Sequence, residues 1–252
     1  RPYIDELVRP NPDDPTGHAM SVTVRQRQAL LLLGPLIRAV PWGPPAAAAA
    51  LSGLAVLPAL LDEPAPGTGL WGLRAAAMLL GAAASFAMVD RMAPLTIDPT
   101  PRWLRQWLRL TVTLLPAATG WLLLYAVVRA ATDATQTGPA GDVMVEAAVC
   151  ALTGLAGAAV AARHRHTSTA ALAGPGTQAV VVTTTLVLGP PHSPWPLPGD
   201  PTWATTHGYW RAALPLTVAV LLLANRATWP MLRWPTRPDR VGQRSARSGR
   251  VT

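Results

Sequence analysis

Long apolar runs separated by short polar stretches dominate the chain between residues 44 and 226. A helix needs about 20 mostly apolar residues to cross roughly 30 Å of hydrocarbon. Six runs meet this requirement, at residues 44–61, 70–89, 108–128, 143–162, 170–189 and 210–225. The runs are continuous and do not alternate with polar positions, which favours helices over the strands of a membrane barrel. We therefore predict an all-α integral membrane protein with six transmembrane helices.

The arginines predict how these spans are oriented, because positively charged residues collect on the cytoplasmic side of a membrane protein. With the N-terminus inside, 18 of the 21 arginines fall in cytoplasmic segments, and only Arg74, Arg129 and Arg211 fall on the outer side. Nine of the ten tryptophans flank spans, as in an aromatic belt, and only Trp121 lies within one. We expect a multi-pass protein of the plasma membrane with both termini in the cytoplasm.

The apolar segment 28–42 precedes the first span and needs its own interpretation. It is only 15 residues long and contains Gly34, Pro35 and Arg38. Counting it as a span would place most arginines outside, so we predict an amphipathic helix that lies in the inner interface. The chain then divides into a polar leader (1–21), an interfacial elbow helix (22–43), a transmembrane domain (44–226) and a basic cytoplasmic tail (227–252).

The composition excludes several classes of protein. Half of the residues are apolar and 13% are charged, which argues against a soluble enzyme and against a disordered chain. All 21 basic residues are arginine, a usage typical of GC-rich genomes such as those of actinobacteria, and the lack of lysine excludes a Walker A loop. The single cysteine excludes an internal disulfide and a multi-cysteine zinc site. No catalytic motif is present, so we expect neither an enzyme nor a bound cofactor.

Histidines are the remaining candidates for a metal or haem site. His164 and His166 lie in an arginine-rich turn, and His192 and His207 flank the outer loop 190–209. Their spacing matches no compact metal site, so we expect no metal. The net charge of +8 does not indicate nucleic-acid binding, because the orientation of the spans already accounts for it.

Arg74 and Glu146 are charged residues inside predicted spans, each about one turn below the outer surface. Charges in a membrane are costly and are usually paired or face a cavity. Two interpretations are open: each side chain reaches the interface independently, or the two form an ion pair or line a polar cavity. Arg74 has a further candidate partner in Glu63, across the short first outer loop.

The fifth run is the least regular, because the glycine-proline-glycine sequence at 174–176 interrupts it. One interpretation is a kinked helix whose threonines bond their own backbone. The other is a broken helix whose polar side chains line a substrate path. With Arg74 and Glu146, the candidate path residues are Gln178, Thr183 and Thr184.

Small residues recur every four positions in two of the runs. Ala77, Gly81 and Ser85 form one stripe, and a second consists of Cys150, Gly154, Ala158 and Ala162. Such stripes let membrane helices approach closely. They are consistent with packing inside one chain and also with dimerisation of two copies.

Residues 101–110, PRWLRQWLRL, form an amphipathic pattern between the second and third spans. Its tryptophans and leucines recur at helical spacing, with the arginines on the other side. The segment is predicted either to anchor the third span in the inner interface or to form a coupling helix that docks on a cytoplasmic partner. The candidate coupling residues are Arg102, Trp103, Arg105, Gln106 and Arg109.

This layout resembles that of the short, six-span permease subunits of ATP-binding-cassette (ABC) exporters. The similarity covers residues 22–226 and rests on the interfacial helix 28–42, the cytoplasmic helix 101–110 and the long outer loop 190–209. Residues 75–116 are also similar to small actinobacterial membrane proteins of ABC transporters. The resemblance implies an ABC ATPase subunit on the cytoplasmic side, which supplies the energy, and a second permease copy in a homodimer or heterodimer.

Two other functions remain open from the sequence. A non-transport membrane protein that anchors or assembles a larger complex would explain the basic tail and the few polar groups within the spans. A membrane enzyme or a haem-handling protein is the third class.

Overall fold

The chain forms an all-helical bundle in a computed structural model that describes residues 34, 37–61, 64–88, 102–164, 168–187 and 193–226. Within these residues there are seven α-helices, three 3-10 helices and no strand. The helices are α2 (Gly43–Val56), η1 (Leu57–Leu60), α3 (Thr68–Ser85), η2 (Phe86–Met88), α4 (Arg102–Ala131), α5 (Ala134–Thr137), α6 (Ala140–His164), η3 (Ser168–Leu172), α7 (Ala173–Val187) and α8 (Trp203–Asn225).

Six of the described helical segments are long and apolar enough to cross a membrane, which confirms the six predicted spans. The chain is thus a multi-pass membrane protein in its architecture. The predicted leader 1–21, the basic tail 227–252 and most of the predicted elbow helix lie outside the described residues.

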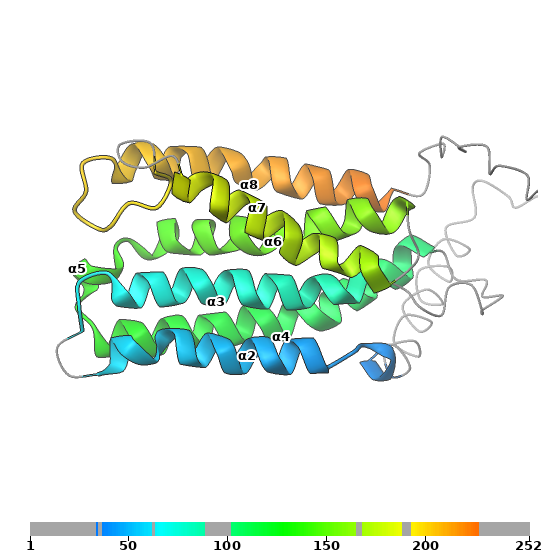
Figure 1. Cartoon of the computed structure of the whole chain (residues 1–252), viewed down its shortest axis with the longest axis horizontal. Helices are drawn as coiled ribbons and strands as arrows, with labels where there is room; N and C mark the ends of the chain where they lie inside the picture. The colour runs from blue at the N-terminus through cyan, green and yellow to red at the C-terminus, as the bar shows by residue number, and fades with distance from the viewer. Residues whose placement is uncertain are drawn as a thin grey trace, which may run out of the picture.

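Helices α3 and α6 form the centre of the bundle (Figure 1). Helix α3 packs against α2, α4, α6 and α7, and α6 packs against α3, α7 and α8. Two thirds of the span in α3 is buried, whereas only about a fifth of the spans in α2, α4, α7 and α8 is buried. The outer helices therefore turn apolar side chains such as Leu115, Leu123 and Val180 outward, as lipid contact requires.

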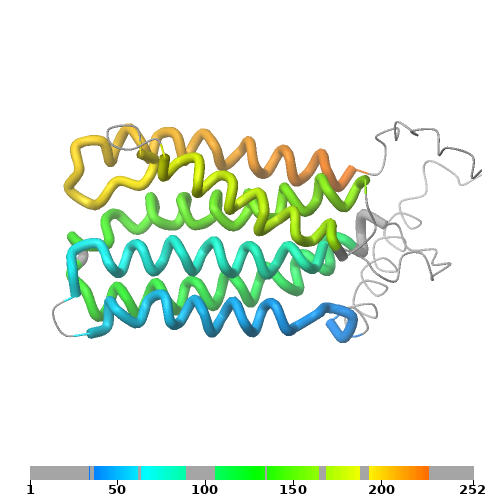
Figure 2. The backbone as a smooth tube through the Cα atoms, viewed as in Figure 1, coloured from blue at the N-terminus to red at the C-terminus, as the bar shows by residue number. Residues whose placement is uncertain are grey.

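The two ends of the bundle differ, and we name them by their content. The cap end holds the connection between α7 and α8, and the terminal end is where α2 begins and α8 ends (Figure 2). The first span therefore begins, and the last span ends, at the same end of the bundle, as an even number of crossings requires. At the terminal end, Arg163 of α6 donates to the carbonyl oxygens of Leu223 (2.9 Å) and Arg226 (3.3 Å), where a cation offsets the negative end of the α8 dipole.

Helix α4 is a single helix of 30 residues, and this corrects one prediction. Residues 102–110 were expected to form a separate helix before the third span, but they are the first turns of α4 itself. At 1.5 Å per residue the helix is about 45 Å long, roughly 15 Å more than the hydrocarbon layer. The amphipathic segment is therefore continuous with the third span, and Pro116 lies inside the same helix.

The fifth span is not interrupted where the sequence suggested. The glycines and proline at 174–176 occupy the first turn of α7, where Pro175 needs no backbone N–H bond within the helix. The irregularity is instead the change from η3 to α7 at Leu172. Thr177 and Thr185 hydroxyls donate to backbone oxygens one turn earlier, at 2.7 and 2.8 Å. Neither a mid-span kink nor a broken helix is required.

The small residues of the two stripes pack within one chain, which confirms the first of the two interpretations. A Cβ atom added to Gly81 of α3 would lie 2.5 Å from the Cα of Ala151 in α6. A Cβ at Gly154 would lie 2.8 Å from the side-chain nitrogen of Gln178 in α7. The glycines thus set the close approach of α6 to both neighbours.

Candidate functional site at the cap end of the bundle

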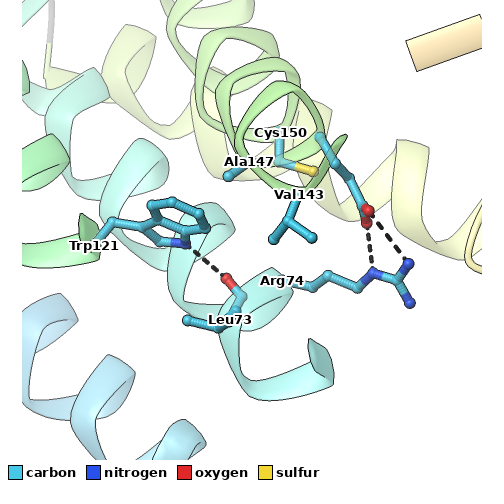
Figure 3. A pocket seen from close by; sticks show the side chains of 7 residues that line it. Leu73, Arg74, Trp121, Val143, Ala147 and Cys150 are labelled. Carbon is cyan, nitrogen blue, oxygen red and sulfur yellow. Dashed lines mark hydrogen bonds and ion pairs between the residues drawn. The ribbon is translucent and has the colours of Figure 1, made fainter. Parts of the chain in front are cut away.

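Arg74 and Glu146 form an ion pair between α3 and α6. The Nε and Nη2 atoms of Arg74 lie 2.5 and 3.2 Å from the two carboxylate oxygens of Glu146 (Figure 3). Only 3% of Arg74 and 1% of Glu146 is exposed. The ion-pair interpretation is therefore confirmed and independent snorkelling is wrong. Glu63, the other candidate partner, lies outside the described residues.

The remaining donors of Arg74 hold the segment Ser193–Thr202, which we call the cap segment. Nη2 of Arg74 donates to the carbonyl oxygen of Pro196 at 2.8 Å, and Nη1 lies 3.5 Å from that of Trp195. The guanidinium carbon also lies 4.9 and 5.5 Å from the ring centroids of Trp71 and Trp195, which suits cation–π attraction. One buried side chain thus links α3, α6 and the cap segment.

Indole N–H groups fix the cap segment to the helices. Trp210 of α8 donates to the carbonyl oxygen of Pro194 at 3.0 Å, and Trp195 donates to the hydroxyl of Thr185 in α7 at 2.9 Å. The rings of Trp195 and Trp210 pack 5.3 Å apart. These tryptophans are among the nine that were predicted to flank the spans as an aromatic belt. Their indoles point into the protein, where they tie the cap segment to α7 and α8.

A short turn leads from the cap segment into α8. The carboxylate of exposed Asp200 accepts hydrogen bonds from the hydroxyl of Thr202 (2.6 Å) and from its backbone N–H (2.8 Å). These bonds stabilise the charged form and lower the pKa of Asp200 below its usual value. The carboxylate of Asp200 therefore stays ionised, and continues to accept both hydrogen bonds, at pH values below the normal titration range of aspartate.

Asp142 and His207 extend the charged cluster on the side of α8. The carboxylate of Asp142 accepts from Nε1 of Trp203 at 3.0 Å and pairs with Arg211 at 2.5 Å. The ring of His207 stacks on Trp203 at 4.1 Å, and its Nδ1 lies 2.9 Å from the carbonyl oxygen of Trp203. The Nε2 atom is buried 3.4 Å from a carboxylate oxygen of Glu146 and makes no hydrogen bond with the described residues.

Sequence reasoning missed part of this cluster, although a spacing signal was present. Asp142 and Glu146 lie four residues apart, and so do Trp203, His207 and Arg211. Residues at this spacing share one face of a helix. The two polar faces, on α6 and α8, meet at the cap end.

A small cavity borders the ion pair. Its volume is about 10 Å³, enough for one water molecule, and its lining is Leu73, Arg74, Trp121, Val143, Glu146, Ala147 and Cys150 (Figure 3). Trp121, the tryptophan inside a predicted span, donates to the carbonyl oxygen of Leu73 at 3.0 Å. This cavity is too small for a solute.

The other candidate path residues do not join this cavity. Gln178 is buried and donates to the carbonyl oxygen of Cys150 at 2.9 Å, which ties α7 to α6. Thr183 and Thr184 are exposed on the outside of α7. Of the five predicted path residues, the structure brings together only Arg74 and Glu146.

The candidate coupling residues lie at the terminal end, in the first turns of α4. Arg102, Trp103 and Arg105 belong to the described helix, but their side chains lie outside the described set. Gln106 is half-buried, whereas only 3% of Arg109 is exposed, so Arg109 presents almost no surface to a partner.

The histidines form no metal site in the described part of the chain. His164 is exposed at the end of α6, and His166 and His192 lie outside the described residues. Among the described residues, no group of three or more histidine, cysteine, aspartate or glutamate side chains is placed to hold a metal ion.

No family model matches this chain, and no significant match is found among the curated proteins or the solved structures.

Replacing Trp203 with phenylalanine should cost about 1.5 kcal/mol of unfolding free energy, because the ring still stacks on His207 but the N–H donor to Asp142 is lost. Unfolding of the purified protein in a denaturing-detergent titration would measure this. Trp71→Phe is the matched control, since that indole donates to no other described residue and its ring position over Arg74 is kept. An equal loss in both variants would show that ring size and not the hydrogen bond matters.

Proposed function

We propose that this protein is the membrane-spanning permease subunit of an ABC transporter in the plasma membrane. It would move a substrate with energy supplied by a separate ATPase subunit, and a second permease copy would complete the assembly. In this proposal the terminal end of the bundle faces the cytoplasm, because the arginine-rich segments of the sequence adjoin it.

The observation that carries this proposal is the length and continuity of α4. The helix exceeds the hydrocarbon thickness by about ten residues, and its amphipathic start, 102–110, lies at the terminal end. Because this segment is continuous with a span, a force on it would act directly on the helix, which contains Pro116 as a point where it can bend. Helix α4 packs mainly against α3 and α2, and its Leu110 also packs with Leu155 of α6 and Leu221 of α8, so a shift of its first turns would reach the centre of the bundle.

The dense packing around the ion pair is consistent with a resting transporter. The cap segment, the Arg74–Glu146 pair and the tryptophan contacts leave room for one water molecule. Substrate would then pass either between two permease copies or through one chain after the cap end opens.

The alternative is a membrane anchor or assembly subunit with no transport role. One observation favours it: Thr183 and Thr184 face outward, and the cavity at the ion pair admits no solute. Two of the five candidate path residues thus lie on the outside of the bundle, away from the cavity at the ion pair.

Partner capture from the native membrane separates these two functions. The full-length protein, purified in mild detergent, should retain a nucleotide-hydrolysing subunit if it is a permease. The variant R102E/R105E should reduce the retained ATPase at least tenfold, because glutamates would reverse the charge of the proposed docking segment. Arg109 is left unchanged, since a glutamate at that buried position would damage the fold.

The variant R240E/R244E is the matched control, because it makes the same change of charge in the basic tail. Equal ATPase retention by R102E/R105E and the wild type would exclude the coupling role of α4. Wild-type protein that retains other membrane subunits and never an ATPase would favour the anchor.

A further inference from the structure

His207 occupies a position where the buried charges do not balance without it. Two carboxylates on α6, Asp142 and Glu146, face it, and among the described residues of the cap end Arg74 of α3 is the buried cation that opposes them. Arg211, on the same helix as His207, pairs with Asp142, but 63% of its side chain is exposed. The thiol of Cys150 is buried on α6 and carries no charge, and Asp200 of the cap segment is exposed and bonded to Thr202. At the cap end, the buried charged side chains of the described residues, Arg74, Asp142 and Glu146, therefore sum to one negative charge when the imidazole is neutral.

The hydrogen bond to Trp203 decides which ring nitrogen holds a proton in the neutral imidazole. A carbonyl oxygen can only accept, so the Nδ1 atom of His207, 2.9 Å from the carbonyl of Trp203, must carry hydrogen. The neutral ring would then turn its Nε2 lone pair toward a carboxylate oxygen of Glu146 at 3.4 Å. Two buried acceptors would face each other, and Nε2 would have no partner among the described residues.

We propose that the Nε2 atom of His207 and the carboxylate of Glu146 form a binding site for one proton at the cap end. The bound proton converts the lone pair into a donor toward Glu146 and cancels the excess negative charge. Glu146 then binds α3 through Arg74 and α8 through His207, so one carboxylate ties three helices together. Loss of the proton would remove the tie to α8 and loosen the α6–α8 contact beside the cap segment. This inference does not depend on the transporter role.

The protonation state of His207 can be read directly by ¹⁵N NMR on the full chain in lipid nanodiscs, with ¹⁵N in the histidine rings. At pH 7.5 an imidazole in water is about 90% neutral. The His207 ring should instead give the two similar nitrogen signals of an imidazolium at this pH. Its signals are assigned by their loss in H207Q or, if that variant does not fold, by elimination with variants of His18, His164, His166 and His192.

Two carboxylate variants test the role of Glu146. In E146Q the ring should be the neutral form, with hydrogen on Nδ1, at pH 7.5. In the matched control D200N, which removes a carboxylate at the same end that does not face the ring, the imidazolium should persist. A neutral ring in the wild-type protein at pH 7.5 would overturn the proposal without any variant. An imidazolium that persists in E146Q would overturn the assignment of the proton to the His207–Glu146 contact.

Discussion

Replacing Glu146 with glutamine should lower the free energy of unfolding by about 3–5 kcal/mol, the usual cost of removing one partner of a buried ion pair. The reason is that the Arg74 guanidinium, which is 3% exposed, would remain buried without a countercharge. An amide in place of the carboxylate can accept one hydrogen bond but cannot neutralise the cation. The measurement is the unfolding of purified protein in a denaturing-detergent titration, followed by circular dichroism.

The double variant R74M/E146L is the informative control for this prediction. It removes both charges and fills their space with apolar side chains, a change that is often neutral for a buried pair. It should therefore recover most of the stability that E146Q loses. A loss below about 1 kcal/mol in E146Q would contradict a buried pair, and a double variant less stable than E146Q would show that the hydrogen bonds of Arg74 to the cap segment matter more than the charges.

The ion pair also bears on which parts of the bundle can move. It joins α3 to α6, the two most buried helices, and Arg74 holds the cap segment to both. Helix α4 contacts α3 and α2, and its Trp121 lines the cavity beside the ion pair. A displacement of α4 would therefore change its contacts with α2 and α3 and would also act, through Trp121, on the cavity beside the ion pair.

The sequence predicted the spans well because a continuous apolar run of about 20 residues has one stable arrangement in lipid. It was less accurate at the ends of helices that begin with polar residues. Helix α8 begins at Trp203, seven residues before the predicted start at 210. Residues 203–209 are too polar to be recognised as part of a span, but Trp203 and His207 find partners in Asp142 and Glu146 on α6. The hydropathy of one segment cannot show that its polar side chains are paired with polar side chains of another segment.

The pairing of Arg74 with Glu146 illustrates a second limit. Depth along each span follows from the sequence, and it placed both residues at a similar level. Whether the side chains face each other depends on which helices are neighbours and on how each helix is rotated about its axis. The positions of residues within each span do not reveal either. Cap-end contacts to the backbone, such as that of Arg74 with Pro196, carry no sequence signature at all.

Glycine spacing, in contrast, was a usable signal, and Gly81 shows why. Its hydrogen faces the backbone of Ala151, so that α3 and α6 approach more closely than side chains would permit. An added Cβ would also lie 3.0 Å from the carbonyl oxygen of Ala151. Backbone atoms in the middle of α6 cannot move aside as the end of a flexible side chain can, so α3 and α6 would have to separate.

Replacing Gly81 with alanine should therefore destabilise the protein by about 1–3 kcal/mol, the range for overpacking a filled interior, even though alanine is the better helix former by about 1 kcal/mol. The matched control is Gly120→Ala in α4, where an added Cβ meets no atom within 4 Å and stability should stay the same or rise. Both variants are compared with the wild type by denaturing-detergent unfolding. Because helix propensity changes equally in the two, a difference between them isolates the α3–α6 contact. Equal stability of the two variants would mean that α3 and α6 do not touch at Gly81. The close packing of these two helices could then not be the reason why Arg74 and Glu146 lie within reach of each other.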